Sequence, residues 1–209
     1  MELSSIKNII FDLGGVIINL RIQNSLDALK KLSRSGQIVE FSQRQQSKLF
    51  DDYETGRITD AAFRQGLRDT YEIEASDAEI DEAWNAMLLD IPQERIDLLL
   101  ALGSQYRLFL LSNTNAIHLE RFTQIVAESF TIPSLDSLFE KTYYSHLIGQ
   151  RKPDGIVFEQ ILIQNNLIPS ETLFIDDSSQ HIAGAELVGI KTLHLAPPLT
   201  INEIFKDAL

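Results

Sequence analysis

Three short apolar runs in this sequence each end in a cluster of acidic or small polar residues. They lie at positions 9–11, 106–111 and 172–175, and two further short runs lie at 141–145 and 191–195. Runs this short that are rich in β-favouring residues are typical of strands rather than helices. Helical patterns separate them, and this alternation predicts a doubly wound, parallel α/β sheet with right-handed crossovers. The polar clusters should therefore meet at the carboxyl edge of the sheet, where such folds bind ligands.

The first cluster begins at Asp12 and continues through Leu13, Gly14 and Gly15. The two glycines allow a sharp turn and let backbone N–H groups approach an anion closely. Asp and Gly are also the ordinary residues of a tight turn. This stretch by itself is compatible with an anion-binding site and with a simple turn.

The composition limits the possible partners. The 209 residues are enough for one core domain and a small accessory domain. A net charge of -12 disfavours nucleic acid and anionic membrane surfaces, so we expect a small-molecule partner. The chain has no cysteine, which excludes disulfides, thiolate zinc sites and a thiol nucleophile. Without a signal-peptide or transmembrane pattern we expect a cytoplasmic protein, and a monomer is compatible with the sequence.

The stretch from residue 19 to about residue 89 contains helical patterns without a convincing strand. It is far longer than a crossover between two strands requires. We therefore predict an inserted helical cap domain at residues 19–90, beside a core domain at residues 1–18 and 91–209. The expected cap helices are 25–32, 44–50, 62–71 and one that Ser76 and Glu79 open as a capping box. On the apolar stripe of this last helix, with Met87 and Leu88, Trp84 is expected in the core rather than against a substrate.

Polar residues also follow the later strands. Ser112 and Asn113 follow the run that ends at residue 111, and Asp176 and Asp177 follow the run that ends at residue 175. Lys152 precedes a helix that the next residue, a proline, is expected to open. Helix capping, turn formation or solvent exposure would each explain one of these residues alone. Their joint occurrence after strands of one parallel sheet favours a shared site.

Taken in order, the four clusters resemble the motif set of the haloacid dehalogenase-like hydrolases. The matching residues are Asp12-Leu13-Gly14, Ser112-Asn113, Lys152-Pro153 and Asp176-Asp177. The chain is similar to the branch of phosphatases that carry a helical cap after the first strand, among them bacterial sugar-phosphate phosphatases. The resemblance spans almost the whole chain and includes the runs 53–57 and 149–154. It implies a Rossmann-like core with a cap and the hydrolysis of phosphate esters.

The resemblance implies catalytic roles for Asp12, Ser112 and Lys152. Asp12 would attack phosphorus and form an aspartyl-phosphate, Ser112 would donate to a phosphoryl oxygen, and Lys152 would neutralise negative charge. Mg²⁺ would be bound by the carboxylates of Asp12 and Asp177 and by the backbone carbonyl of Gly14.

The same resemblance implies supporting roles for further positions. The backbone amides of Leu13 and Gly14 would bind the phosphate, together with the side chains of Ser112, Asn113 and Lys152. Asp176 would orient Lys152 or a metal-bound water. His181 stands where the family more often has Asp or Asn. It could be an outer-sphere ligand, an acid–base group or a solvent-facing residue in a first helical turn.

One departure from the family pattern concerns the proton that the leaving group needs. Most phosphatases of this family carry a second Asp two residues after the nucleophile, and this chain has Gly14 there. General acid–base catalysis typically contributes about 10²–10⁴-fold. We therefore expect a preference for esters with better leaving groups, such as sugar 1-phosphates.

The sequence thus predicts a Mg²⁺-dependent phosphomonoesterase for a small phosphorylated metabolite, with a sugar phosphate expected. A metal-independent 2-haloacid dehalogenase would use the same Asp12, but the adjacent Asp176 and Asp177 favour a bound cation. A non-catalytic protein that binds a phosphorylated ligand is the remaining alternative. Candidates in the cap for contact with the substrate are Arg21, Lys48 and Arg57.

Overall fold

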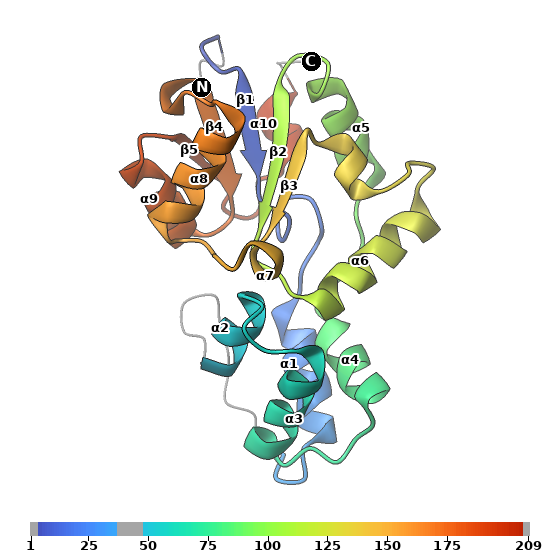
Figure 1. Ribbon diagram of the computed structural model, residues 1–209. Coiled ribbons are helices and arrows are strands. Elements are labelled where there is room, and N and C mark those ends of the chain that lie inside the picture. The colour runs from blue at the N-terminus through green and yellow to red at the C-terminus, as the bar shows by residue number, and fades with distance from the viewer. Residues whose placement is uncertain (1–3, 37–47, 207–209) are drawn as a thin grey trace.

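The computed structural model describes residues 4–36 and 48–206. Its centre is a sheet of five strands in the order β3-β2-β1-β4-β5 (Figure 1). The strands are β1 (Asn8–Phe11), β2 (Arg107–Ser112), β3 (Lys141–Tyr144), β4 (Thr172–Asp176) and β5 (Lys191–His194). Every pairing is parallel, which confirms the predicted Rossmann-like sheet.

Helices cover both faces of this sheet. They are α5 (Gln93–Leu102), α6 (Ala116–Ser129), α8 (Gly155–Asn165), α9 (Ser179–Leu187) and α10 (Ile201–Phe205). The short helix α7 (Ser145–Ile148) follows β3 at the carboxyl edge of the sheet (Figure 1). Alternate strand residues face opposite sides, so Ile10 and Phe174 pack with α8 and α9. Phe11 and Ile175 belong to the cluster that includes α5, α6 and α10. Because both faces are buried, the strands appear in the sequence as continuous apolar runs.

A second group of helices lies beyond the carboxyl edge of the sheet (Figure 1). These cap helices are α1 (Ile22–Leu32), α2 (Lys48–Glu54), α3 (Asp60–Tyr71) and α4 (Asp77–Asn85). They enclose their own apolar cluster, in which the rings of Phe50 and Trp84 stack with centroids 5.4 Å apart. Trp84 is only 4% exposed and packs in this cluster, as predicted for a core residue, but it also lines the pocket described below. Ser76 and Glu79 form the predicted capping box.

Two chain crossings link the cap to the core. The N–H of Asn19 donates to the carbonyl of Asp90 at 2.9 Å, and the carbonyl of Asn19 accepts from the N–H of Leu89 at 3.0 Å. The N–H of Arg21 donates to the carbonyl of Met87 at 2.9 Å. These bonds tie the two crossings to one another and support the domain boundaries that we propose at residues 18 and 91.

The last cap helix is shorter than its apolar pattern predicts. α4 ends at Asn85, so Met87 and Leu88 lie in the crossing that returns to the core. The N–H of Met87 donates to the hydroxyl of Ser25 at 2.9 Å. A tertiary hydrogen bond therefore occupies the amide that another helical turn would use.

Other helix boundaries also differ from the prediction. α1 begins at Ile22 rather than at residue 25, and α3 begins at Asp60 rather than at residue 62. α2 continues to Glu54, beyond the predicted helix end at residue 50, because Tyr53 packs into the cap cluster. α8 begins at Gly155 rather than at Pro153, and Asp154 is its N-cap residue. Residues 44–47 of the second predicted cap helix lie outside the described residues.

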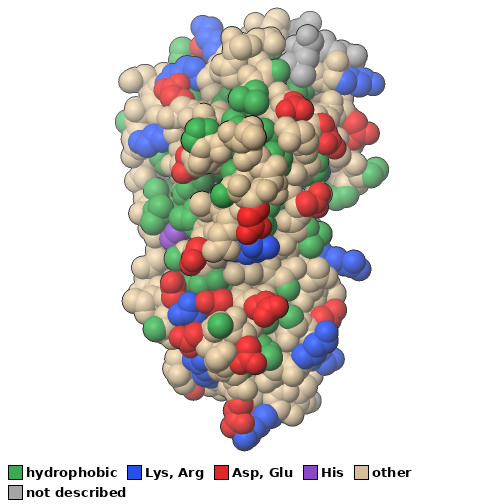
Figure 2. Space-filling view, turned by 90° about the vertical axis from the view of Figure 1, so that its right-hand side faces the viewer, with side chains coloured by type: hydrophobic (Ala, Val, Ile, Leu, Met, Phe, Trp, Pro, Cys, Tyr) green, Lys and Arg blue, Asp and Glu red, His purple; other side chains and the backbone are tan. Residues whose placement is uncertain are grey.

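The surface carries mixed charge. On the face shown in Figure 2, Asp and Glu side chains are interspersed with Lys and Arg, and the basic residues do not gather in one patch. This distribution matches the net charge of -12. None of the helices within 4–36 and 48–206 is both long and apolar enough to cross a membrane.

Candidate active site at the carboxyl edge of the sheet

Asp12, Ser112 and Asp176 lie at adjacent strand ends. Ser112 and Asp176 are the last residues of β2 and β4, and Asp12 directly follows β1. The N–H of Asp12 donates to the carbonyl of Ile175 at 2.9 Å, which fixes it beside β4. The strand order reverses between β1 and β4, and α/β sheets bind ligands at the carboxyl side of such a switch point. The fold therefore brings these predicted polar residues to one place.

Lys152 lies at the centre of this cluster. Its side chain is fully buried, and Nζ lies 2.5 Å from Oδ1 of Asp12, 2.7 Å from Oδ2 of Asp176 and 2.9 Å from the carbonyl of Leu111. An ammonium group has three hydrogens to donate, and these three acceptors can take all of them. The position of Lys152 is thus set by both carboxylates and by β2.

Asn113 holds the backbone of Lys152 from both sides. Its side-chain N–H donates to the Lys152 carbonyl at 2.9 Å, and its side-chain oxygen accepts from the Lys152 N–H at 3.0 Å. The residue after Lys152, Pro153, lies against α9, and a Cβ added to Gly184 of this helix would lie 2.2 Å from the Pro153 carbonyl oxygen. Only a glycine lets α9 approach this segment so closely. Asn113 therefore positions Lys152, in addition to lying near the expected phosphate position.

Asp176 is held by the start of α9 as well as by Lys152. The N–H of Ser178 donates to its Oδ1 at 2.8 Å, and Nδ1 of His181 lies 3.0 Å from each carboxylate oxygen. Because a carboxylate only accepts, the hydrogen of the neutral ring lies on Nδ1. His181 is 7% exposed, so it is not the solvent-facing residue that one interpretation of the sequence allowed.

The charges of the cluster influence one another strongly. Burial raises the pKa of Asp12 to about 8. The positive charge of Lys152 lowers this pKa, but desolvation and the negative charges of Asp176 and Asp177 raise it by more. Burial of Lys152 favours a lower pKa, but Asp12 and Asp176 outweigh it and raise the pKa. Burial of Asp176 favours a higher pKa, yet Lys152 and His181 lower it. Lys152 and Asp176 are thus held charged, and a negative charge on Asp12 calls for a further cation.

The carboxylates fit such a cation. Asp12, Asp176 and Asp177 each offer an oxygen, and these oxygens all lie within 4.8 Å of one another. Hard oxygen donors in this number suit Mg²⁺. Gly15 has a φ of +74°, and a Cβ there would lie 2.4 Å from Oδ2 of Asp177. The loop after Asp12 therefore requires glycine both for its turn and for the space that the Asp177 carboxylate occupies.

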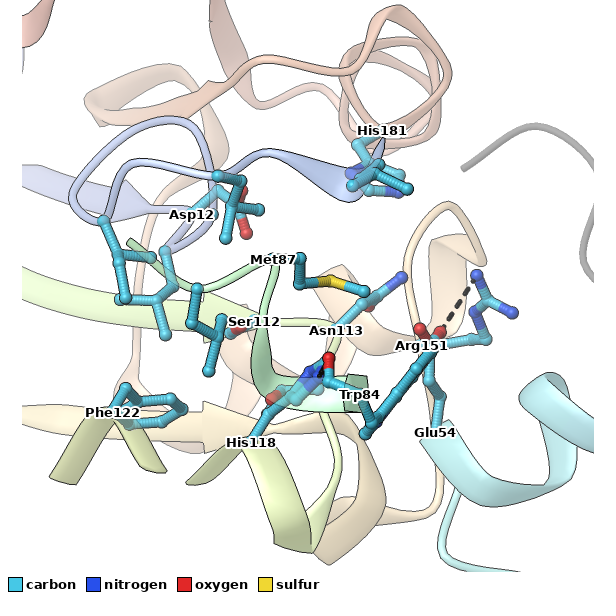
Figure 3. A pocket seen from close by; sticks show the side chains of 17 residues that line it. Asp12, Glu54, Trp84, Met87, Ser112, Asn113, His118, Phe122, Arg151 and His181 are labelled. Carbon is cyan, nitrogen blue, oxygen red and sulfur yellow. Dashed lines mark hydrogen bonds and ion pairs between the residues drawn. The ribbon is translucent and has the colours of Figure 1, made fainter. Parts of the chain in front are cut away.

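A pocket of about 110 Å³ lies in front of the cluster, between the carboxyl edge and the cap (Figure 3). The predicted site residues that line it are Asp12, Leu13, Gly14, Ser112, Asn113 and His181. Lys152 and Asp176 are fully buried behind this lining, where they contact Asp12 or its neighbours without facing the pocket. The edge thus offers the carboxylate of Asp12 and the hydroxyl of Ser112 to a ligand.

Comparison with known proteins decides the family. Residues 6–189 match the family of haloacid dehalogenase-like hydrolases. The chain belongs to this family. It is 31% identical over 187 residues, 90% of each chain, to D-ribitol-5-phosphate phosphatase of Bacteroides thetaiotaomicron.

Two solved structures of haloacid dehalogenase family proteins are similar over nearly the full length. One is an enzyme of Bacteroides thetaiotaomicron in complex with magnesium and inorganic phosphate; its TM-score is 0.90 at 36% identity, with 96% of this chain and 98% of that chain covered. The other is a hydrolase of Porphyromonas gingivalis with a TM-score of 0.80 at 34% identity and 91% of each chain covered.

Two contacts between the cap and the core of this hydrolase also line the pocket, and the sequence did not reveal them. Nη2 of Arg151 lies 3.2 Å from Oε2 of Glu54. The rings of Trp84 and His118 stack with centroids 4.8 Å apart, and Nε2 of His118 lies 3.2 Å from the carbonyl of Trp84. Arg151 could have been found from its place next to Lys152. Nothing in the sequence pairs it with Glu54.

The three basic cap residues proposed from the sequence as substrate contacts do not line the pocket. Lys48 and Arg57 both pair with Asp52, and their side chains are 86% and 67% exposed. Arg21 is also exposed. The arginine that does line the pocket, Arg151, comes from the core domain of the hydrolase.

Proposed function

We propose that this hydrolase is a cytoplasmic, Mg²⁺-dependent phosphomonoesterase that acts on a small sugar or polyol phosphate. The observation that carries the proposal is the convergence of Asp12, Lys152 and the Asp176–Asp177 pair at one end of a pocket. The similarity to a D-ribitol-5-phosphate phosphatase and to an enzyme that holds magnesium and inorganic phosphate supports it.

Asp12 is the nucleophile of the proposed reaction. One carboxylate oxygen attacks phosphorus and forms an aspartyl-phosphate, and the bond between phosphorus and the ester oxygen breaks. Because Gly14 offers no acid, the ester oxygen leaves as an alkoxide that takes its proton from solvent water. Water then attacks the phosphorus of this intermediate, which releases inorganic phosphate and restores the carboxylate. Lys152 fixes Asp12 through the 2.5 Å contact and neutralises charge on it. The hydroxyl of Ser112 and the backbone amides of Leu13 and Gly14 donate to phosphoryl oxygens.

The carboxylates of Asp12 and Asp177 and the carbonyl of Gly14 would hold Mg²⁺. Asp176 already accepts hydrogen bonds from three groups, so its role is to orient Lys152 and the start of α9. When bound, the ion supplies positive charge to the phosphoryl oxygens.

The two alternatives are less well supported. A dehalogenase of this fold needs no metal, whereas the one positive charge of Lys152 does not balance three clustered carboxylates, which favours a second cation. A protein that only binds a phosphorylated ligand would not need Lys152 buried against a potential nucleophile.

The test is a phosphatase screen over sugar and polyol phosphates with Mg²⁺ or with EDTA, with Asp12→Asn as the blank. Phosphate release by the wild type with Mg²⁺, and by neither control, is the expected result. Chloride release from 2-haloacids in EDTA would establish the dehalogenase instead. Saturable binding of a phosphorylated ligand without turnover would establish the binding protein.

A further inference from the structure

The pocket ends in an ion pair between the cap and the core. Arg151 lies 3.2 Å from Glu54 of α2 and also pairs with Asp51, one turn earlier on the same helix. The side chains of Arg151 and Glu54 are only 17% and 15% exposed. Figure 3 shows this pair on one side of the pocket and Asp12 on the other. A substrate whose phosphate lies at Asp12 therefore directs its far end toward Glu54 and Arg151.

The wall between these two ends is largely apolar. Its side chains come from the chain crossings, α4 and α6, and include Leu20, Trp84, Met87, Leu88 and Phe122. These apolar side chains pack against C–H groups and make no hydrogen bonds to hydroxyls. Of the polar residues that also line the pocket, Asn113 and His118 are already hydrogen-bonded within the protein.

The ion pair supplies both kinds of hydrogen bond that a hydroxyl makes. A carboxylate such as Glu54 accepts from an O–H group, and the guanidinium of Arg151 donates to a hydroxyl oxygen. A polyol chain has C–H groups for the apolar wall and hydroxyls for this pair.

The charge at this end of the pocket disfavours a second anion. Arg151 carries one positive charge, and its partners Asp51 and Glu54 carry two negative charges. The arginine is therefore already compensated, and a substrate carboxylate would meet net negative charge in a partly buried place.

The size of the pocket limits the length of the substrate. A water molecule needs about 10–15 Å³ of cavity volume, so the pocket of about 110 Å³ corresponds to roughly seven to eleven water-sized positions. A phosphoryl group fills several of them. The remainder accommodates a chain of roughly three to five carbons.

We propose that Glu54 and Arg151 form a specificity subsite that selects short, uncharged polyol chains and rejects substrates with a second anionic group. This inference rests on the proposed phosphatase function and adds to it the residues that choose the leaving alcohol. Because Arg151 directly precedes Lys152, the subsite also ties the position of the cap to the segment that carries the catalytic lysine.

The experiment compares D-ribitol 5-phosphate with 5-phospho-D-ribonate, which carries a carboxylate in place of the terminal CH₂OH. Acetyl phosphate, too short to reach the subsite, is the reference. We expect the wild type to prefer the ribitol ester at least about tenfold in kcat/KM. Glu54→Gln should reduce that preference about tenfold, mainly by raising KM for the ribitol ester. It should also lower the ratio of kcat/KM for the ribitol ester to kcat/KM for acetyl phosphate.

The matched control is Asp52→Asn. It removes the same charge from the same helix, but Asp52 pairs with Lys48 and Arg57 and does not line the pocket. We expect both ratios to stay within about twofold of the wild type. Arg151→Lys, which keeps the charge and loses the planar guanidinium, should also reduce the ribitol preference, and it carries the test if Glu54→Gln does not fold.

Two outcomes would overturn the proposal in distinguishable ways. If the wild type hydrolyses both five-carbon esters equally well, or if Glu54→Gln and Asp52→Asn change the ratios alike, the subsite is wrong while the phosphatase stands. If the wild type hydrolyses neither of the two esters nor acetyl phosphate with Mg²⁺, the proposed function fails and the subsite fails with it.

Discussion

The two ends of the pocket are built in different ways. At the carboxyl edge, Asp12 and Asp176 sit on strand ends, and Lys152 is fixed by three acceptors. At the opposite end and along the adjoining wall, which together we call the cap–core boundary, the Glu54–Arg151 and Trp84–His118 contacts join different segments through side chains. The fold itself positions the first end, whereas the second depends on where the cap lies. Substitutions at the Glu54–Arg151 pair should therefore change selectivity, and substitutions at the edge should change catalysis and stability.

The largest effect is expected at the edge, for Lys152→Met. This change leaves the buried carboxylates of Asp12 and Asp176 without their ammonium partner, which should destabilise the fold by about 3–5 kcal/mol. Phosphatase activity should be lost as well. Urea denaturation without added Mg²⁺ measures the stability. Adding Asp176→Asn should restore part of it, because one of the two unpaired charges is gone. A loss below about 1 kcal/mol, or no recovery in the double variant, would show that the ammonium is not the main compensating charge.

The next effect concerns the boundary and depends on pH. Burial lowers the pKa of His118 to about 4 from its ordinary 6.5. Between these two pH values His118 binds a proton in the unfolded chain but not in the folded chain. Its contribution to the free energy of unfolding is therefore fully present above pH 6.5 and is lost as the pH falls toward 4. The loss is about 3 kcal/mol at 1.36 kcal/mol per pKa unit.

His118→Phe tests this linkage, because it keeps an aromatic ring against Trp84 without a titrating group. Denaturation at pH 7 and at pH 4 should show a smaller loss of stability in the variant than in the wild type. An equal loss in both proteins would mean that other groups account for the acid sensitivity.

The sequence predicted the edge far better than the boundary, for a physical reason. Asp12, Ser112 and Asp176 follow apolar runs, and parallel topology alone brings such positions together. The Glu54–Arg151 pair depends on how two domains pack, which no local pattern encodes. Met87 shows a similar effect on a smaller scale. Its spacing continues the helix pattern, but its N–H donates to the hydroxyl of Ser25 instead of to a helix carbonyl, and the helix ends earlier.

Gly15→Ala should weaken Mg²⁺ binding at the edge by about 10–100-fold, because the new Cβ would lie 2.4 Å from Oδ2 of Asp177 and displace that carboxylate. Calorimetric titration with Mg²⁺ measures the change directly. Gly149→Ala is the matched control, since Gly149 has a similar φ of +70° but nothing within 4 Å of the added Cβ. If both variants lose the same Mg²⁺ affinity, backbone strain rather than the contact with Asp177 is responsible.

The smallest effect is expected at Gly14, where the edge meets the chain crossing into the cap. Without an acid at this position to protonate the leaving alcohol, the rate should depend on the acidity of that alcohol. Ribose 1-phosphate, whose anomeric oxygen is the better leaving group, should therefore be hydrolysed about tenfold faster than ribose 5-phosphate. A Cβ at Gly14 would lie 2.5 Å from Cδ1 of Leu20, the end of a flexible side chain. Gly14→Asp combined with Leu20→Ala therefore supplies both the acid and its space, and the rate ratio should fall toward one while Leu20→Ala alone leaves it high. A wild type that prefers the 5-phosphate would show that another group already protonates the leaving alcohol.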